Sequence, residues 1–477
     1  MSERALHGAA RFVRRLAAKL FAIALLGACI QPAPLPREKD PIEAAFVLLG
    51  AGGAPIARAI TRAAECPSLV VDGAARPMSV RAAPATLPLR PTMSSAAESK
   101  PSVFPVLVCD APLATGASRA SIAGHALPLP RHEVRRIVVI GDTGCRLKIS
   151  DDVFQACDSP AAWAFPQIAV AAAATQPDLV IHVGDYHYRE NGCPSADAGC
   201  AGSPWGYGWD AWKADFFGPA QPLLAAAPWV VVRGNHESCN RAGQGWWRLL
   251  DPRQLAPRRN CDDPRDDSVG DYSEPYAVPA GADMQLIVFD SSKVKVAALA
   301  ATDAMYRNYD AQMRQAFARA GGAAHNFFLV HHPVLGFAPN PTLKPTGLDP
   351  GNEALQSVLE PIHPRVLFPP SVQMLLSGHV HLFEMVSFAT AQPAQLISGN
   401  GGTWSDAPLP LERARAAEPA PGARIESIVS TTQHGFLTLE KQEAGAWRIE
   451  VRDGRGQSIT TCMLRDAKAQ CTPEKLP

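Results

Sequence analysis

The chain has 477 residues, which is enough for two or three domains with a substantial core. Its 45 basic and 45 acidic residues give a formal net charge of zero, which excludes a protein whose whole surface neutralises nucleic-acid phosphates. Hydrophobic residues make up 47% of the chain, which excludes global disorder. The 44 Pro and 36 Gly follow no fixed period, so a collagen and a repeat solenoid are excluded as well.

The first 28 residues have the features of an export signal. Basic residues precede an apolar run, Leu20 to Ala28, that is too short to span a bilayer. The run ends in Leu-Gly-Ala-Cys at Cys29, which resembles a bacterial lipobox, whose cysteine carries a lipid. We therefore expect residues 1–28 to be a signal peptide of lipoprotein type and Cys29 to be lipidated; an ordinary signal cleaved nearby is the alternative. Residues 29–45 are Pro-rich and predict a tether, so we expect a periplasmic or cell-envelope protein that is anchored to the membrane.

Residues 1–28 hold five basic residues and one acid, so the remaining chain carries a formal charge of −4. No other apolar run is long enough to span a bilayer. The charge and the lack of a basic stripe predict no nucleic-acid-binding surface.

Ten cysteines follow Cys29, and an even number behind an export signal indicates disulfides. A zinc site built on cysteines is the alternative, which the lack of a Cys-x-x-Cys pair disfavours. The sequence does not fix the connectivity, but pairing neighbours closes five loops of plausible length. This order favours the pairs Cys66–Cys109, Cys145–Cys157, Cys193–Cys200, Cys239–Cys261 and Cys462–Cys471.

Residues 46–130 predict a small β-rich domain, because short apolar runs alternate there with Pro, Gly and Ser. These runs are Ser68–Val71, Met78–Arg81 and Val103–Cys109. The segment Ile56–Ala64 fits a helix as well as a strand.

Residues 131–477 predict an α/β domain, in which apolar strands alternate with helical stretches. The expected strands are Ile137–Ile140, Leu179–Val183, Trp229–Val232, Leu286–Phe289, Phe327–Val330 and Met374–Leu376. Helices are expected near Phe165–Ala174 and Ala301–Ala320. The chain ends in a predicted β segment, with strands at Gly435–Glu440 and Trp447–Arg452.

Clusters of polar residues follow five of these strands. They are Gly141-Asp142-Thr143-Gly144, Gly184-Asp185-Tyr186-His187-Tyr188, Gly234-Asn235-His236-Glu237, His331-His332-Pro333 and Gly378-His379-Val380-His381. In α/β sheets, ligands bind at the carboxyl ends of the strands. Asp, Asn, Tyr and His together offer the mixed oxygen and nitrogen ligands that suit Fe, Mn or Zn. The set is too large for one ion with an open position, and it suits two ions about 3.5–4 Å apart that share one carboxylate.

This series of motifs resembles the calcineurin-like metallophosphoesterases and, within them, the purple acid phosphatases. Their pattern is Asp-x-Gly, Gly-Asp-x-x-Tyr, Gly-Asn-His-Asp/Glu, Val-x-x-His and Gly-His-x-His. Gly144 and Tyr188 favour the purple acid phosphatase branch, whereas Phe328 departs from the pattern, which has Val there. The segment Gly399–Gly402 resembles the glycine-rich turn after the last motif. The resemblance covers about residues 135–455, and it implies a β-sandwich flanked by helices in α/β/β/α layers, here preceded by the small β-rich domain.

The resemblance also implies a ligand set for two metal ions, a ferric ion and an Fe(II), Zn or Mn ion. The first ion would take Asp142, Asp185, Tyr188 and His381. The second would take Asp185, Asn235, His331 and His379, with Asp185 as the bridge. Because the family often has His-x-Pro at the fourth motif, His331 is favoured over His332 as the ligand.

The catalytic residues would be Asp185 and His236. By this resemblance, His236 protonates the leaving oxygen or stabilises the phosphoryl group. His332 either contacts the substrate or packs around the metal ligands.

The sequence thus predicts an exported, acid phosphatase-like enzyme that hydrolyses phosphate monoesters by attack of a metal-bound hydroxide. One alternative is a phosphodiesterase that uses the same site on nucleotides or phospholipid headgroups. The other alternative is a non-catalytic surface lipoprotein with a structural metal site. His236 disfavours this last alternative, because a structural site needs no additional acid. The oligomeric state is not predicted.

Overall fold

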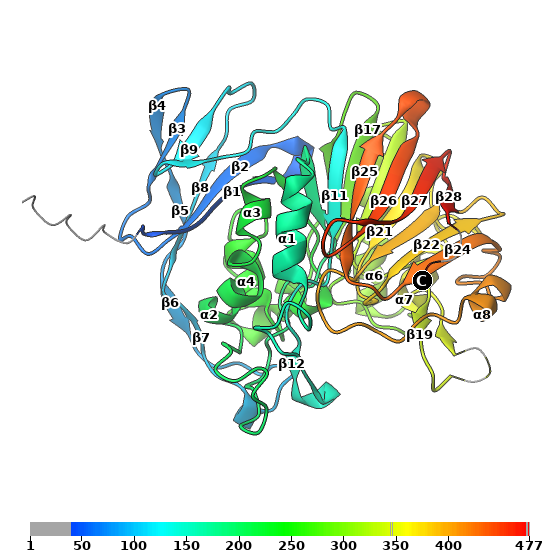
Figure 1. Ribbon diagram of the computed structural model, residues 1–477, viewed down its shortest axis with the longest axis horizontal. Helices are drawn as coiled ribbons and strands as arrows, with labels where there is room; N and C mark the ends of the chain where they lie inside the picture. The colour runs from blue at the N-terminus through cyan, green and yellow to red at the C-terminus, as the bar shows by residue number, and fades with distance from the viewer. Residues whose placement is uncertain (1–39, 344, 346, 474–475, 477) are drawn as a thin grey trace, which may run out of the picture. The chain divides into compact units, whose positions relative to one another are not determined.

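Two large β-sheets that pack face to face form the centre of the computed structural model, which describes residues 40–343, 345, 347–473 and 476. The expected signal peptide, the lipidation site Cys29 and most of the expected tether lie outside the described residues. Residues 41–477 form one compact unit. The blue N-terminal strands and the red C-terminal strands lie at opposite ends of the larger sheet (Figure 1).

The larger sheet has eleven strands, and β11, β14, β15 and β1 at its middle run parallel. In spatial order the strands are β28 (Lys468–Thr472), β27 (Ser458–Arg465), β26 (Trp447–Asp453), β25 (Gly435–Lys441), β11 (Arg136–Ile140), β14 (Leu179–His182), β15 (Trp229–Val231), β1 (Ile42–Leu49), β2 (Pro55–Thr61), β8 (Leu107–Pro112) and β5 (Ser79–Ala82).

The second of the two large sheets has seven strands, of which β17, β18, β21 and β23 run parallel. Its order is β16 (Tyr276–Pro279), β17 (Met284–Phe289), β18 (His325–Val330), β21 (Val372–Ser377), β23 (Ala394–Ser398), β22 (Phe383–Phe388) and β24 (Ile425–Thr431). The predicted strands of residues 131–477 all lie in these two sheets.

Both faces of the central strands are buried, which explains their continuous apolar runs. In β11, Val139 packs between the two sheets, whereas Val138 and Ile140 pack under the helices on the outer face. Helices α1 (Phe165–Ala174), α3 (Gln221–Leu224) and α4 (Gly243–Leu249) cover this face.

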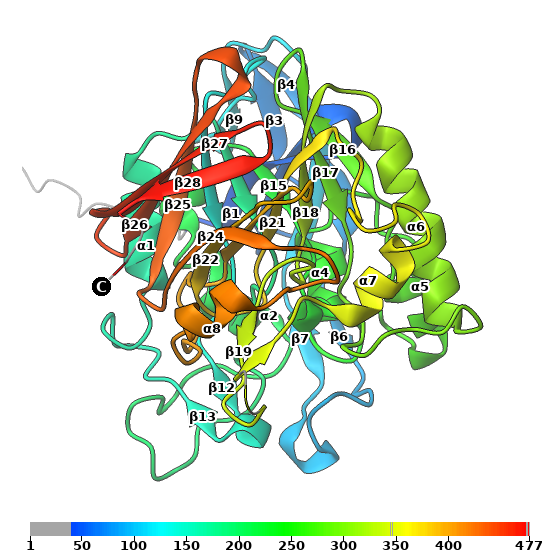
Figure 2. The same cartoon turned by 90° about the vertical axis from the view of Figure 1, so that its right-hand side faces the viewer.

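Helices α6 (Ala304–Ala320) and α7 (Glu353–Leu359) cover the outer face of the seven-stranded sheet. Figure 2 shows α1 on one side of the strands and α6 and α7 on the other. The layers are therefore α/β/β/α, as predicted. The shorter helices are α2 (Trp209–Trp212), α5 (Asp267–Gly270) and α8 (Leu411–Ala416), and the helical turn Lys213–Phe217 follows α2.

The N-terminal region is rich in strands, as predicted, but it continues the larger sheet instead of standing apart from it. Strand β1 pairs in parallel with β15 at Leu48 and Trp229, and β2 and β8 follow outward. Strand β1 also begins at Ile42, inside the segment expected to be a tether. The physical reason is that Phe46–Leu49 are buried and that β15 gains a hydrogen-bonded neighbour.

The segment with two possible structures, Ile56–Ala64, contains strand β2. A separate four-stranded sheet, β10-β9-β3-β4, packs on this region with a core of its own that includes Val47 and Leu69. Its strands are β10 (His125–Ala126), β9 (Ala120–Ile122), β3 (Ser68–Val71) and β4 (Ala74–Pro77). Three two-stranded pairs complete the sheets: β6 (Ala85–Leu87) with β7 (Ser102–Phe104), β12 (Leu147–Lys148) with β13 (Val153–Phe154), and β19 (Ala338–Pro339) with β20 (Leu348–Asp349).

Five disulfides join the cysteine pairs that neighbour pairing favours: Cys66–Cys109, Cys145–Cys157, Cys193–Cys200, Cys239–Cys261 and Cys462–Cys471. Disulfides at this density are typical of an exported protein. Among the residues that the structure describes, no helix has the length and apolarity needed to cross a membrane.

Candidate metal centre

The polar clusters of the five motifs meet where the two sheets bring the carboxyl ends of their parallel strands together. Strands β11, β14 and β15 of the larger sheet lead into Asp142, Asp185 and Asn235. Strands β18 and β21 of the smaller sheet lead into His331 and His379. Both sheets therefore contribute side chains to one site.

A first group of side chains surrounds the phenol of Tyr188. Its hydroxyl oxygen lies 2.9 Å from Asp142 Oδ1 and 3.0 Å from Asp185 Oδ2. The same oxygen lies 3.0 Å from His381 Nε2. These are the four residues that the sequence predicts for the first metal ion.

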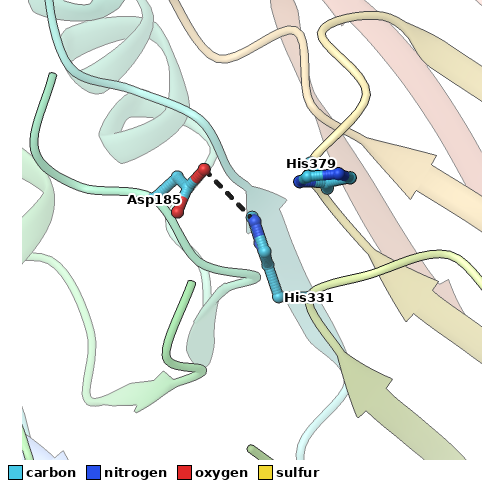
Figure 3. Close-up of side chains that lie close together, drawn as sticks. All are labelled: Asp185, His331 and His379. Carbon is cyan, nitrogen blue, oxygen red and sulfur yellow. Dashed lines mark ion pairs between the residues drawn. The ribbon is translucent and has the colours of Figure 1, made fainter. Parts of the chain in front are cut away.

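A second group surrounds the amide oxygen of Asn235, which lies 3.0 Å from His331 Nε2 and 2.9 Å from His379 Nδ1. Asp185 Oδ2 lies 3.2 Å from His331 Nε2 (Figure 3). Ligand atoms of Asp185, His331 and His379 all lie within 4.8 Å of one another. Asp185 thus belongs to both groups, which is the position predicted for a bridging carboxylate.

The backbone of the ligand loops adopts unusual conformations that aim these side chains. Asp142, Asp185 and His379 have φ angles of 56°, 58° and 71°, in the left-handed region that non-glycine residues rarely adopt. At Gly184, where φ is 108°, a Cβ would lie 2.3 Å from His331 Nδ1. Glycine at this position therefore allows the imidazole to pack directly against the loop of the shared carboxylate.

The ring of His331 is oriented so that Nε2 can bind a metal ion. Its Nδ1 lies 2.8 Å from the carbonyl oxygen of Val183, so Nδ1–H donates to this oxygen and Nε2 faces the centre. His332 has another environment: its Nδ1 lies 2.9 Å from Ser291 Oγ, and its ring centre lies 4.3 Å from that of His379. Of the two histidines, His331 is the one placed among the predicted ligands.

The two carboxylates of the site are fully buried and differ in acidity. Burial raises the pKa of Asp142 well above its ordinary value, and the charge of Asp185 raises it further. Burial also opposes ionisation of Asp185, but the adjacent His331 and His236 lower its pKa well below the ordinary value. Burial opposes the charged form of His331 as well, yet Asp185 raises the pKa of His331 to about 9. Asp185 and His331 therefore form an ion pair in this structure.

Burial lowers the pKa of His379 and of His381 to about 3. Both imidazoles are thus neutral at neutral pH, which is the form that binds metal ions.

His236 lies beside the first group, with its ring centre 3.9 Å from that of Tyr188. Its backbone N–H donates to Asp185 Oδ1 at 2.8 Å, and its Nδ1 lies 3.1 Å from Glu190 Oε1. The guanidinium of Arg241 bonds Glu190 and contacts the imidazole of His236. Burial and, after it, the charge of Arg241 lower the pKa of His236 to about 3.

Several residues that support the site were not singled out from the sequence. Glu237 accepts hydrogen bonds from the backbone N–H groups of Gly234, Asp185, Tyr186 and His187, and thereby joins the second and third motifs. Its place in the Gly-Asn-His-Glu motif was a usable signal. Glu190 and Arg241 follow two of the motifs closely, but nothing in their spacing predicts that they meet.

The donor set fits a pair of cations. Asp142 and Asp185 are 0% and 1% exposed, and their partners are a phenol, backbone N–H groups and imidazoles rather than a lysine or an arginine. Two adjacent buried carboxylates are costly without compensating positive charge; protonated His331 supplies one such charge here, and two bound cations would supply more. The oxygen and nitrogen donors are those that iron, zinc and manganese accept.

Comparison with known proteins gives the class. The calcineurin-like phosphoesterase family matches residues 135–383, which is more than half of the chain, so the protein belongs to this family. It is therefore a metal-dependent phosphoesterase whose family implies a dinuclear metal site. No curated protein matches the sequence.

Two of the solved structures that match this chain illustrate the shared fold. The purple acid phosphatase PPD1 from yellow lupin (Lupinus luteus) seeds aligns with a TM-score of 0.54 and 13% identity, over 87% of this chain and 73% of that one. PhoD aligns with a TM-score of 0.52 and 10% identity, over 92% of this chain and 93% of that one. At these identities the likeness concerns the fold alone.

Proposed function

We propose that the protein is an exported phosphatase with two metal ions that hydrolyses phosphate monoesters in the manner of an acid phosphatase. The observation that carries this proposal is the position of Tyr188, whose phenol oxygen is within 3.0 Å of Asp142, Asp185 and His381. A phenolate among two carboxylates and an imidazole favours a ferric ion on charge grounds. The second group favours Fe(II), Zn or Mn.

The proposed ligands are Asp142, Asp185, Tyr188 and His381 for one ion, and Asp185, Asn235, His331 and His379 for the other. Two bound cations would lower the pKa of water and neutralise phosphate oxygens during displacement.

His236 is the proposed group that contacts the leaving oxygen. Glu190 and the carbonyl oxygen of His187 both lie within hydrogen-bonding distance of its Nδ1, at 3.1 and 3.0 Å, so Nδ1–H fixes the ring. Nε2 lies 3.8 Å from Asp185 Oδ2, so it faces the carboxylate that both groups share. With its proton on Nδ1, the neutral imidazole has only a lone pair at Nε2, so Nε2 donates to the ester after protonation; the negative charge of a bound ester favours this protonation by raising the pKa of His236. His332, which packs on His379, is proposed to support that ring and to border the bound ester.

The proposed location is the periplasm or cell envelope, with a lipid on Cys29. The five disulfides support export, and the lipobox-like sequence supports the anchor. Cys29→Ser should release the protein from the membrane fraction, and unchanged fractionation would contradict the lipid anchor.

The test of the reaction uses residues 30–477 with the metal content measured. Turnover of an aryl phosphate monoester is compared with that of the matching diester between acid and neutral pH. We expect a monoester preference with an acid optimum, and loss of both activities in Asp185→Asn. A diester preference would replace the proposal with the phosphodiesterase alternative. A fully metal-loaded protein that hydrolyses neither ester would refute it in favour of a structural metal site.

A further inference from the structure

A cationic side chain that no motif contains lies next to the proposed first metal group. Arg146 Nη1 is 3.3 Å from His381 Nδ1, and the guanidinium carbon lies 5.8 Å from the ring centre of Tyr188. The side chain of Arg146 is 17% exposed, so it can be reached from solvent.

The position of Arg146 is fixed by its surroundings. Its Nε donates to Asp151 Oδ2 at 3.1 Å, and its Nη2 bonds the same carboxylate. Its backbone N–H donates to Gln155 Oε1 at 2.9 Å. The residue follows Cys145, which is joined to Cys157, and it precedes the β12–β13 hairpin. The guanidinium is therefore held before any ligand arrives, which limits the entropy lost on binding.

The contact with His381 cannot persist as a hydrogen bond when the site holds metal. If His381 Nε2 binds a cation, its Nδ1 carries the proton and has no lone pair to accept from Arg146. Asp406 supplies a negative charge near this proton, because its Oδ1 lies 3.9 Å from Nδ1 and its Oδ2 accepts the backbone N–H of His381. Arg146 Nη1 thus keeps a free donor at the edge of the loaded site.

We propose that Arg146 binds a terminal oxygen of the substrate phosphoryl group and selects phosphate monoesters over diesters. This inference rests on the proposed function. A monoester dianion has three terminal oxygens, so one remains for Arg146 after two have met the metal ions. A diester has two terminal oxygens and one charge, and its second ester group leaves the Arg146 donor without an anionic partner.

The experiment compares metal-loaded wild type with R146Q, R146K and the control K148Q. Lys148 lies two residues away in β12, with its Nζ 3.6 Å from Asp151 and 3.9 Å from Glu190, so K148Q removes the same charge without touching the proposed metal ligands. For each protein, kcat/KM is measured for an aryl monoester and its diester. The Kd of inorganic phosphate is measured by calorimetry, and bound metal is quantified.

R146Q should lower kcat/KM for the monoester about 10- to 100-fold and raise the phosphate Kd by a similar factor, the size expected for a hydrogen bond to a charged group. The diester should change less than about threefold, because it does not use this donor. R146K should lower the monoester-to-diester ratio about three- to tenfold, since a lysine keeps the charge but lacks the planar fork. K148Q should leave both esters within about threefold.

Equal losses on the two esters, an unchanged phosphate Kd, or a K148Q effect as large as that of R146Q would overturn the assignment. If R146Q fails to retain its metal, the monoester-to-diester ratio of kcat/KM in R146K tests the assignment instead. Wild-type protein that hydrolyses neither ester would count against the proposed function. In that case, the Kd of inorganic phosphate for wild type and R146Q would still test the role of Arg146.

Discussion

The hydroxyl of Tyr188 contacts both carboxylates of the site and the imidazole of His381. Burial raises the pKa of its phenol well above the ordinary value, and the neighbouring Asp142 and Asp185 raise it further. Ionisation of this phenol therefore requires strong compensating charge, which a ferric ion would supply. If Tyr188 binds a ferric ion as a phenolate, as proposed, the iron-loaded protein should absorb visible light.

Tyr188→Phe tests this point. The variant keeps the ring, so its packing against His236 should persist, but it loses the proposed phenolate ligand. We expect the visible absorption of iron-loaded protein to disappear and the affinity of the first metal position to fall at least about tenfold. Absorption spectra and metal titration measure the two effects. Retained visible absorption would contradict the assignment of Tyr188 as a ligand.

Glu384 in β22 illustrates a buried acid outside the site. It is 0% exposed, and it accepts the backbone N–H of Phe337 at 3.1 Å. Burial raises its pKa from 4.5 to about 8. Below the unfolded-state pKa the group is protonated in both states. Between the two pKa values the unfolded chain loses the proton while the folded chain keeps it, so stability falls as the pH rises from 4.5 to about 8.

Glu384→Gln should remove this dependence. The amide keeps an oxygen for the Phe337 N–H and carries no charge in either state. We expect the variant and the wild type to have similar stability near pH 4.5 and the variant to be more stable near pH 8, by a few kcal/mol at about 1.4 kcal/mol per pH unit. Urea unfolding of metal-free protein at both pH values measures the difference. Equal stability at the higher pH would show that Glu384 ionises normally.

At the scale of elements, short segments between strands orient the ligand loops. Asp215 lies in the helical turn Lys213–Phe217 and is fully buried. Its carboxylate accepts the backbone N–H groups of Cys145, Tyr188 and Arg189 at 2.9, 2.6 and 3.0 Å, together with the Nε of Arg189 at 2.7 Å. One acid thus joins the loop after β11 to the loop after β14.

Asp215→Asn should weaken this junction. The amide can accept fewer of these bonds and leaves a buried guanidinium without its counter-ion, which costs about 3–5 kcal/mol. We expect a lower unfolding midpoint and a lower metal content. Asp210→Asn is the matched control, because Asp210 is 52% exposed and its carboxylate pairs with Lys100 at the surface, at 3.4 Å. Equal behaviour of the two variants would argue against a role for Asp215 in the site.

The disulfides offer a second test at this scale. Cys145–Cys157, Cys193–Cys200 and Cys239–Cys261 each begin just after a ligand loop, which suggests that they hold the loops in place. Replacing Cys145 and Cys157 by Ala should lower metal affinity in addition to global stability, the latter by about 3 kcal/mol for a loop of this size. Replacing Cys462 and Cys471, which join β27 and β28 away from the site, should lower stability alone. Equal metal affinities in the two variants would contradict the idea.

At the scale of the whole molecule, sequence patterns predict the core strands well, because strands buried on both faces are uninterrupted apolar runs. The runs at Ile137–Ile140 and Phe327–Val330 fall within β11 and β18, and the helix expected at Phe165–Ala174 is α1. The pairing of β1 with β15 was not predictable. It joins Leu48 to Trp229, and the local sequence of neither strand indicates which strand it pairs with.

The same distinction applies to the site. The predicted ligands follow buried strands within a few residues, so local sequence gives their positions. Arg146, Asp215 and the Glu190–Arg241 pair act through contacts between distant segments. Such contacts depend on how loops pack, and a single sequence contains no periodic signal for them.

The site joins the two sheets, so metal binding should stabilise the whole unit. Asp142, Asp185 and Asn235 come from the larger sheet, and His331 and His379 come from the smaller one. The ion pair of Asp185 with His331 must give up a proton when a cation binds, because the pKa of His331 is raised to about 9. Metal affinity should therefore rise with pH up to about that value.

Chelation should accordingly lower the unfolding temperature of the protein, and it should do so more at pH 8 than at pH 5. Free metal at 100 times its Kd adds about 2.7 kcal/mol to the free energy of unfolding. For a unit of this size, that corresponds to a rise of several degrees or less in the unfolding temperature. Calorimetric scans with and without chelator at both pH values measure the effect. Asp185→Asn is the control, because it removes the shared ligand and should make the unfolding temperature insensitive to chelator. An equal shift in that variant would show that the stabilising metal binds elsewhere.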